Sequence, residues 1–191
     1  AIGEMLFRGI YLANLNEVPL LDEESHQKIY ASFSLLSMLT PPGPLYPSLG
    51  DNGGPLADPI LQLGIKMLSH PMCTELERAR MLQKDADPEI LPRDFCSTKA
   101  GFLCSRSSYR HDGNYILMSA KTGCGCSGHN HMDLLSLFLT FRGQAFIGEP
   151  YTDKLYHSIR MNSELRGYMY NMTSHNTVLA HGEPVLPDCV Y

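Results

Sequence analysis

The chain has 191 residues, a formal net charge of -5 and no block of lysine or arginine. A nucleic-acid partner requires a basic stripe, so nucleic-acid binding is disfavoured. The hydrophobic content of 43% is ordinary for a globular protein and excludes a mainly disordered chain. No apolar run approaches the ~20 residues that span a bilayer, so no membrane partner is expected.

The start of the chain and its cysteines add two expectations. The sequence begins at Ala1 without a charged and then apolar leader, which indicates a processed product or, as we expect, a piece of a longer protein. Six cysteines in a chain of this size are too sparse for a disulfide scaffold, and we expect most of them to be buried as small apolar residues.

The first half of the sequence predicts helices. Acidic or hydroxyl residues indicate three helix starts, at Asp22, Asp58 and Thr74. The first helix has the clearest pattern, because Ile29, Phe33 and Leu36 recur on one face. The proline-rich run Pro41–Pro44 should end it.

The second half predicts strands and therefore an α+β fold. Short apolar runs bounded by glycine, asparagine and aspartate cover residues 102–109, 114–120, 134–141, 144–148 and 176–180. Arg142-Gly143 is typical of a tight hairpin between two of these runs. Helices followed by strands favour two segregated units with a boundary near residue 95.

Histidines and a carboxylate lie at the ends of these predicted strands. His129 and His131 are two residues apart, a spacing that points both side chains to one face of a strand. Glu149 follows another predicted strand, and His175 precedes the last one. Neighbouring antiparallel strands can bring His131, Glu149 and His175 together, and two imidazoles with a carboxylate form a common zinc site.

Two other interpretations of these histidines stay open. They can be ordinary polar loop residues that only form hydrogen bonds. Alternatively, the Cys-x-Cys-x-x-His-x-His run from Cys124 to His131 could supply the ligands of a metal site. This run lacks the two-residue gap that usually separates zinc-binding cysteines. In a zinc site each imidazole needs a partner that orients it, and Asp133 or Asn176 could serve.

Three residues after the predicted strands are weaker candidates. Tyr156 lies in a polar segment near Lys154 and His157, where a phenol could have a lowered pKa and transfer protons. Packing is the more common role, since the chain has ten tyrosines. Arg160 and Arg166 could bind an anionic ligand or could be solvated surface charges.

Three motifs occur in an order and spacing that resemble the heparinase II/III-like polysaccharide lyases, a family that includes alginate and oligoalginate lyases. The motifs are Gly128–Ser136, Gly143–Pro150 and Ser174–Val178. The resemblance is strongest from Arg106 to Gly182. It implies that residues 1–95 are the C-terminal helices of an incomplete (α/α) toroid. Residues 96–191 would then be the first part of an antiparallel β-sandwich.

The resemblance also implies a reaction, β-elimination on an acidic, uronic-acid-containing polysaccharide. By motif, His129 and Tyr156 match catalytic residues of the cleft. His131, Glu149 and His175 match ligands of a zinc ion that is mainly structural. Glu149 stands where the family usually has aspartate, a longer carboxylate that can still bind zinc.

The same resemblance implies the remaining expectations. Asn130 and Arg160 are candidate substrate-binding residues, and the location would be periplasmic or secreted. The family's toroid supplies further catalytic groups from helices upstream, so the isolated chain is expected to be inactive. The alternative is a non-catalytic, zinc-stabilised domain that binds carbohydrate or is purely structural, and the sequence indicates no oligomeric state.

Overall fold

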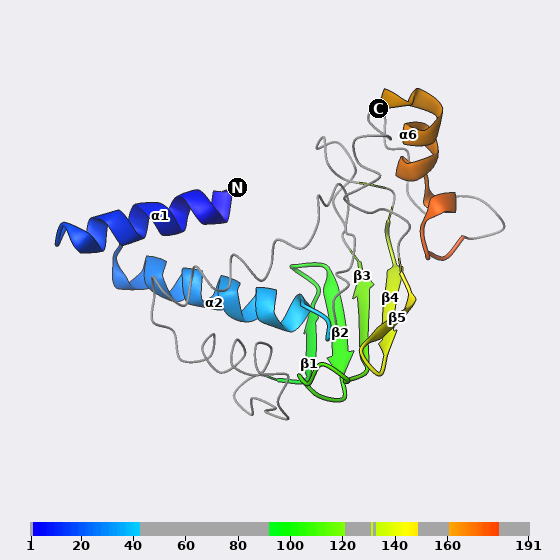
Figure 1. Ribbon diagram of the computed structural model, residues 1–191, viewed down its shortest axis with the longest axis horizontal. Helices are drawn as coiled ribbons and strands as arrows, with labels where there is room; N and C mark the ends of the chain where they lie inside the picture. Colours follow the sequence, from blue (N-terminus) through cyan, green and yellow to red (C-terminus); the bar gives the residue numbers. More distant parts are fainter. Residues whose placement is uncertain (1, 43–91, 121–130, 132, 149–160, 180–191) are drawn as a thin grey trace. The chain divides into compact units, whose positions relative to one another are not determined.

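A computed structural model describes residues 2–42, 92–120, 131, 133–148 and 161–179. The chain divides into two compact units. The first contains helices α1 (Ile2–Leu15) and α2 (Glu23–Leu39). The second contains a five-stranded sheet, helix α6 (Ser163–Tyr170) and the short 3-10 helix η1 (Met172–Ser174) (Figure 1). Across the described ranges, no helix is both long and apolar enough to span a bilayer.

Helix α2 starts where the sequence predicts. The Asp22 carboxylate accepts a hydrogen bond of 2.8 Å from the backbone N–H of Ser25, which satisfies one of the free donors of the first turn. A hydrogen bond from the Ser25 side chain, together with this backbone bond, lowers the pKa of Asp22. Glu23 and Glu24 add negative charge at the positive end of the helix dipole. The helix ends at Leu39, before the prolines, so this prediction is confirmed.

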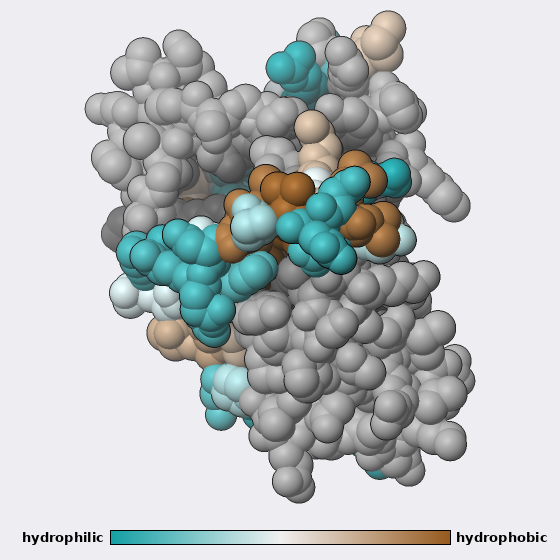
Figure 2. Space-filling view, turned by 90° about the vertical axis from the view of Figure 1, so that its left-hand side faces the viewer, coloured by the Kyte–Doolittle hydropathy of each residue, from teal (hydrophilic) through white to brown (hydrophobic). Residues whose placement is uncertain are grey.

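Helix α1 buries only some of its apolar side chains. Phe7 and Ile10 are buried, whereas Leu12 and Leu15 are more than half exposed. Figure 2 shows that apolar side chains reach the surface between hydrophilic ones on the side that it draws. The helices predicted from Asp58 and Thr74 lie outside the described residues.

The sheet is an antiparallel meander in which each strand pairs with the next in sequence. Its order is β1-β2-β3-β4-β5. The strands are β1 (Asp94–Ser97), β2 (Phe102–Arg106), β3 (Tyr115–Ser119), β4 (Ser136–Phe141) and β5 (Gln144–Ile147). The α+β class is therefore confirmed, whereas the domain ranges 1–95 and 96–191 stay a prediction.

One face of the sheet forms the core of the second unit. Along β3 and β4 every second residue is buried, the period expected of strands with one covered face. Leu117 is paired with Phe138, and the Tyr115 and Phe138 rings pack edge to face with centroids 6.4 Å apart. Burial raises the pKa of the Tyr115 phenol well above its ordinary value.

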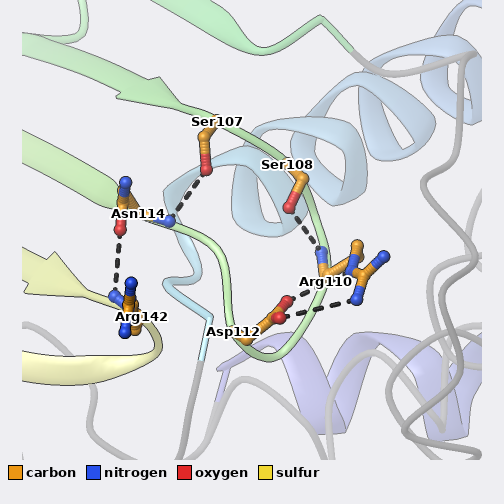
Figure 3. A network of polar contacts seen from close by, with 6 residues as sticks. All are labelled: Ser107, Ser108, Arg110, Asp112, Asn114 and Arg142. Carbon is orange, nitrogen blue, oxygen red and sulfur yellow. Dashed lines mark hydrogen bonds and ion pairs between the residues drawn. The ribbon is translucent and has the colours of Figure 1, made fainter.

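The β4–β5 hairpin docks on the loop between β2 and β3. Arg142 and Gly143 both have positive φ, 50° and 72°, as a two-residue type I′ turn requires. The Arg142 N–H donates to the Asn114 side chain at 2.9 Å, and the Gly143 N–H donates to the Gly113 carbonyl at 3.0 Å. Figure 3 shows the bond between Arg142 and Asn114, together with the ion pair of Arg110 with Asp112 in the same loop. The predicted hairpin is confirmed.

Five elements differ between the sequence prediction and the structure. The strand expected at residues 176–180 is wrong, because Asn176–Leu179 is irregular. The Leu137 N–H of β4 donates to the Asn176 carbonyl, but the described residues 176–179 have no strand conformation, and a ladder needs a series of such bonds. Strand β1 and the helices α1, α6 and η1 were not predicted as individual elements.

Candidate functional site

Two of the predicted site residues lie together at one end of the sheet. The ring centroids of His131 and His175 are 5.3 Å apart, with an angle of 46° between the ring planes. His131 is 6% exposed and His175 is partly buried. The other predicted site residues lie outside the described residues, and their roles stay predictions: His129, Asn130, Glu149, Tyr156 and Arg160.

A tight turn at the start of β4 carries the chain away from His131. The Ser136 N–H donates to the Asp133 carbonyl at 3.0 Å, which closes the turn. Leu135 has a positive φ of 61°, a conformation that costs a side-chain-bearing residue about 1–2 kcal/mol. Asp133 is only 3% exposed. Because Asp133 and Ser136, the two ends of this turn, are both buried, the turn has little freedom to relax.

A helix and a 3-10 turn carry His175. The Asn162 side chain caps α6 by accepting from the N–H of Leu165 at 3.0 Å. The His175 N–H donates to the carbonyl of Met172 at 3.1 Å, and the Met172 side chain is almost fully buried. The backbone of His175 is therefore held by its bond to Met172, whose side chain is buried, and not only by the contact of its ring with His131.

The two residues after His175, here named the 176–177 clamp, join it to the sheet. The Asn176 carbonyl accepts from the Leu137 N–H of β4 at 3.0 Å, and the Asn176 side-chain amide donates to the carbonyl of Gly148 at 2.5 Å. The Thr177 hydroxyl donates to the carbonyl of Leu134. Asn176 was predicted as a partner for an imidazole, but this amide bond goes to the backbone beyond β5. The role of Thr177 was not predicted, although its position in Ser174–Val178 was a signal.

The histidine pair fits a bound zinc ion. Zinc binds imidazole nitrogens at about 2.0–2.1 Å with tetrahedral angles, which would place two ligating rings about 5 Å apart by centroid. The observed centroid distance is 5.3 Å. The Nδ1 atom of His131 and the Nε2 atom of His175 are both shielded from solvent. Within the described part of the chain, no group of three potential metal ligands occurs. The run from Cys124 to His129 lies outside that part.

The arginines at the opposite end of the sheet are held by local contacts. The Arg106 guanidinium is buried, 4.1 Å from the ring centroid of Tyr109 and 4.8 Å from that of Tyr115. Arg110 is paired with Asp112 at 3.1 Å, and its hydrogen bonds lower the pKa of that carboxyl. This end is separated from the Ser136 end of β4, which follows His131 in the chain, by the length of that strand, about 17 Å at ~3.4 Å per residue. Neither arginine adds positive charge to the histidine site.

The fold is similar to that of solved heparan sulfate lyases. A heparinase III, the BT4657 gene product, superposes with a TM-score of 0.69 over 95% of this chain at 16% sequence identity. The heparan sulfate lyase HepC from Pedobacter heparinus gives a TM-score of 0.68 over 96% of the chain, also at 16% identity. A further heparinase III gives 0.69 over 93% at 14% identity. The predicted resemblance is thus confirmed at the level of the fold.

The likeness covers a limited part of those proteins. The chain spans 28% of the length of the BT4657 product and of HepC, and 30% of the further heparinase III. No protein-family model matches the sequence, and no curated protein does. The fold is therefore the shared property, and an activity for this chain has to be argued from its own residues.

Proposed function

We propose that this chain is part of a polysaccharide lyase that cleaves a uronic-acid-containing polysaccharide by β-elimination. The observation that carries the proposal is the pair of His131 and His175, at the end of β4 in a fold shared with heparan sulfate lyases. His131 and His175 belong to two of the three motifs on which the sequence resemblance depends, Gly128–Ser136 and Ser174–Val178.

The reaction needs a base and a means of neutralising charge. The base removes the C5 proton of the uronate, electrons move to form a C4–C5 double bond, and the bond from C4 to the glycosidic oxygen breaks. The barrier comes from negative charge that builds up on the carboxyl group, so the site must stabilise that charge. We assign the proton transfers to His129 and Tyr156. Asn130 and Arg160 would bind the substrate.

The proposal includes a zinc ion held by His131, His175 and Glu149. Glu149 directly follows Gly148 in the sequence, and Gly148 is bonded to Asn176, the residue after His175. The donor set of two imidazoles and a carboxylate suits zinc. When bound, the ion supplies a structural cross-link between these segments, and the acid and base remain side chains of the protein.

The finer architecture and the location belong to the same proposal. We assign residues 1–95 to the end of an (α/α) toroid and the β1–β5 sheet to the first layer of an antiparallel β-sandwich. The likeness over 93–96% of the chain supports this assignment. The location would be periplasmic or secreted, as the family resemblance implies.

Zinc content tests the metal part of the proposal. We expect about one zinc per purified chain by elemental analysis, and loss of that zinc in His131→Ala and in His175→Ala. His111→Ala is the matched control, because His111 is an exposed histidine at the opposite end of the sheet. Zinc that is absent from the wild type, or retained by both site variants, would contradict the assignment.

Oligosaccharide binding tests the substrate part. Uronate oligosaccharides from heparan sulfate and alginate, titrated into isotopically labelled chain, should shift the NMR signals of His131 and His175. The signals of the 107–114 loop should not move, since that loop lies at the other end of the sheet. Shifts confined to that loop would favour the non-catalytic alternative. The isolated chain should give no rise in the ultraviolet absorbance of an unsaturated product, and a clear rise would overturn the expectation that it is inactive by itself.

A further inference from the structure

His131 and His175 lie close together although they are far apart in the sequence, so contacts elsewhere must set the position of one ring relative to the other. In the 176–177 clamp, Thr177 is hydrogen-bonded to Leu134, which lies 43 residues earlier in the sequence. Asn176 is hydrogen-bonded to Gly148, which lies 28 residues earlier. Leu134 follows His131 by three positions, and the clamp directly follows His175. The clamp bonds therefore connect the chain next to His175 with two places: the segment just after His131, and the residue that follows β5.

Side chains, and not the backbone alone, give this contact its register. The backbone bond from Leu137 to the carbonyl of residue 176 could be formed by any residue, because every residue has a carbonyl group. A slip of one residue along β4 would keep such a bond but would turn His175 away from His131, since neighbouring residues in an extended chain face opposite sides. The amide donor of Asn176 and the hydroxyl donor of Thr177 are available at one register only.

We propose that Asn176 and Thr177 are positioning residues that hold His175 opposite His131 and thereby set the metal affinity of the site. The inference rests on the proposed zinc site and deepens it. Neither residue is itself a ligand in this assignment. Their hydrogen bonds end on the carbonyls of Gly148 and Leu134, so they act through the position of the backbone that carries His175.

Zinc affinity, measured by competition with a chromophoric chelator, tests the inference. We expect Asn176→Ala and Thr177→Val to weaken zinc binding about 10- to 100-fold, the usual effect of losing an outer partner of a metal site. The stoichiometry at saturation should stay at one zinc per chain. Thr177→Ser keeps the hydroxyl and should bind zinc within about threefold of the wild type.

The matched control is Asn114→Ala. Asn114 also joins two segments 28 residues apart, by accepting the Arg142 N–H at 2.9 Å, but it lies at the opposite end of the sheet. This variant should lower the thermal midpoint and leave zinc affinity unchanged. The absorption spectrum of the cobalt-substituted chain should change in Asn176→Ala and stay as in the wild type in Asn114→Ala, which separates a shifted ligand geometry from a general loss of stability.

The outcomes distinguish the inference from the proposed function. A wild type that binds no zinc overturns both. A wild type that binds zinc, together with Asn176→Ala and Thr177→Val variants of unchanged affinity, overturns the positioning role and leaves the zinc site standing. An equal loss of affinity in Asn114→Ala also overturns it, because the effect would then follow stability and not alignment.

Discussion

Replacing Gly143 by alanine should destabilise the sheet strongly, because two separate costs meet at this residue. Its φ of 72° lies in the left-handed region, which costs an L-residue about 1–2 kcal/mol. A Cβ atom built there would lie 2.0 Å from the carbonyl oxygen of His111. Relieving such an overlap requires a backbone shift, which typically costs about 1–3 kcal/mol. We expect Gly143→Ala to lower the free energy of unfolding by about 2–5 kcal/mol.

The overlap is hard to relieve because the hairpin and the loop are bonded at the same place. Moving the two backbones apart would stretch the hydrogen bond from Gly143 to Gly113, which is 3.0 Å long. Gly143→Asn separates the two costs, since asparagine tolerates positive φ but still carries the Cβ atom. We expect this variant to recover less than half of the loss.

Urea unfolding followed by the near-ultraviolet circular dichroism of the tyrosines is the assay, since Tyr115 is buried in this sheet and the chain has no tryptophan. Gly167→Ala is the matched control. Gly167 lies in α6 with no atom within 4 Å of the added methyl position, and alanine there should be neutral or stabilising by up to about 1 kcal/mol. A Gly143→Ala variant within ~0.5 kcal/mol of the wild type would refute the reasoning.

Two further predictions concern titration and thiol reactivity. Hydrogen bonds from Arg110 lower the pKa of Asp112 below its ordinary value of 3.8, so this pair stabilises the fold above about pH 4 and loses its effect as the pH falls through the lowered pKa. An NMR titration should show that Arg110→Gln raises this pKa, and an unchanged midpoint would contradict the pairing. Cys104 is 2% exposed, and burial raises the pKa of its thiol. Peptide mapping should therefore find the exposed Cys96 alkylated in the native state and Cys104 only after unfolding; equal rates would count against the buried position.

The sequence predicted those elements whose signals are local. Asp22 and the prolines after Leu39 defined α2, because a cap and a helix breaker act within one turn. Arg142-Gly143 predicted a hairpin, because a two-residue turn between apolar runs has few solutions. A local signal for α6 existed as well, in Asn162 at its cap and Glu164 in its first turn, but Gly167 weakens the helical pattern.

Other features depend on tertiary contacts that a pattern does not contain. Asn176–Leu179 has strand-like composition, yet one backbone bond and two side-chain bonds hold its first residues in an irregular form. The sequence identified His131 and His175 as candidates through motif likeness and spacing. Their contact could not be derived from periodicity, since it depends on the turn at Leu135 and on the clamp.

The meander has a consequence for the order of assembly. Every strand pairs with its neighbour in sequence, so β1 to β5 can form from short-range contacts, which generally fold fast. The link between Thr177 and Leu134 closes a span of 43 residues and must wait for chain that is synthesised later. During translation His131 would therefore be in place beside the completed sheet before His175 is synthesised, so the proposed zinc site could form only after the sheet.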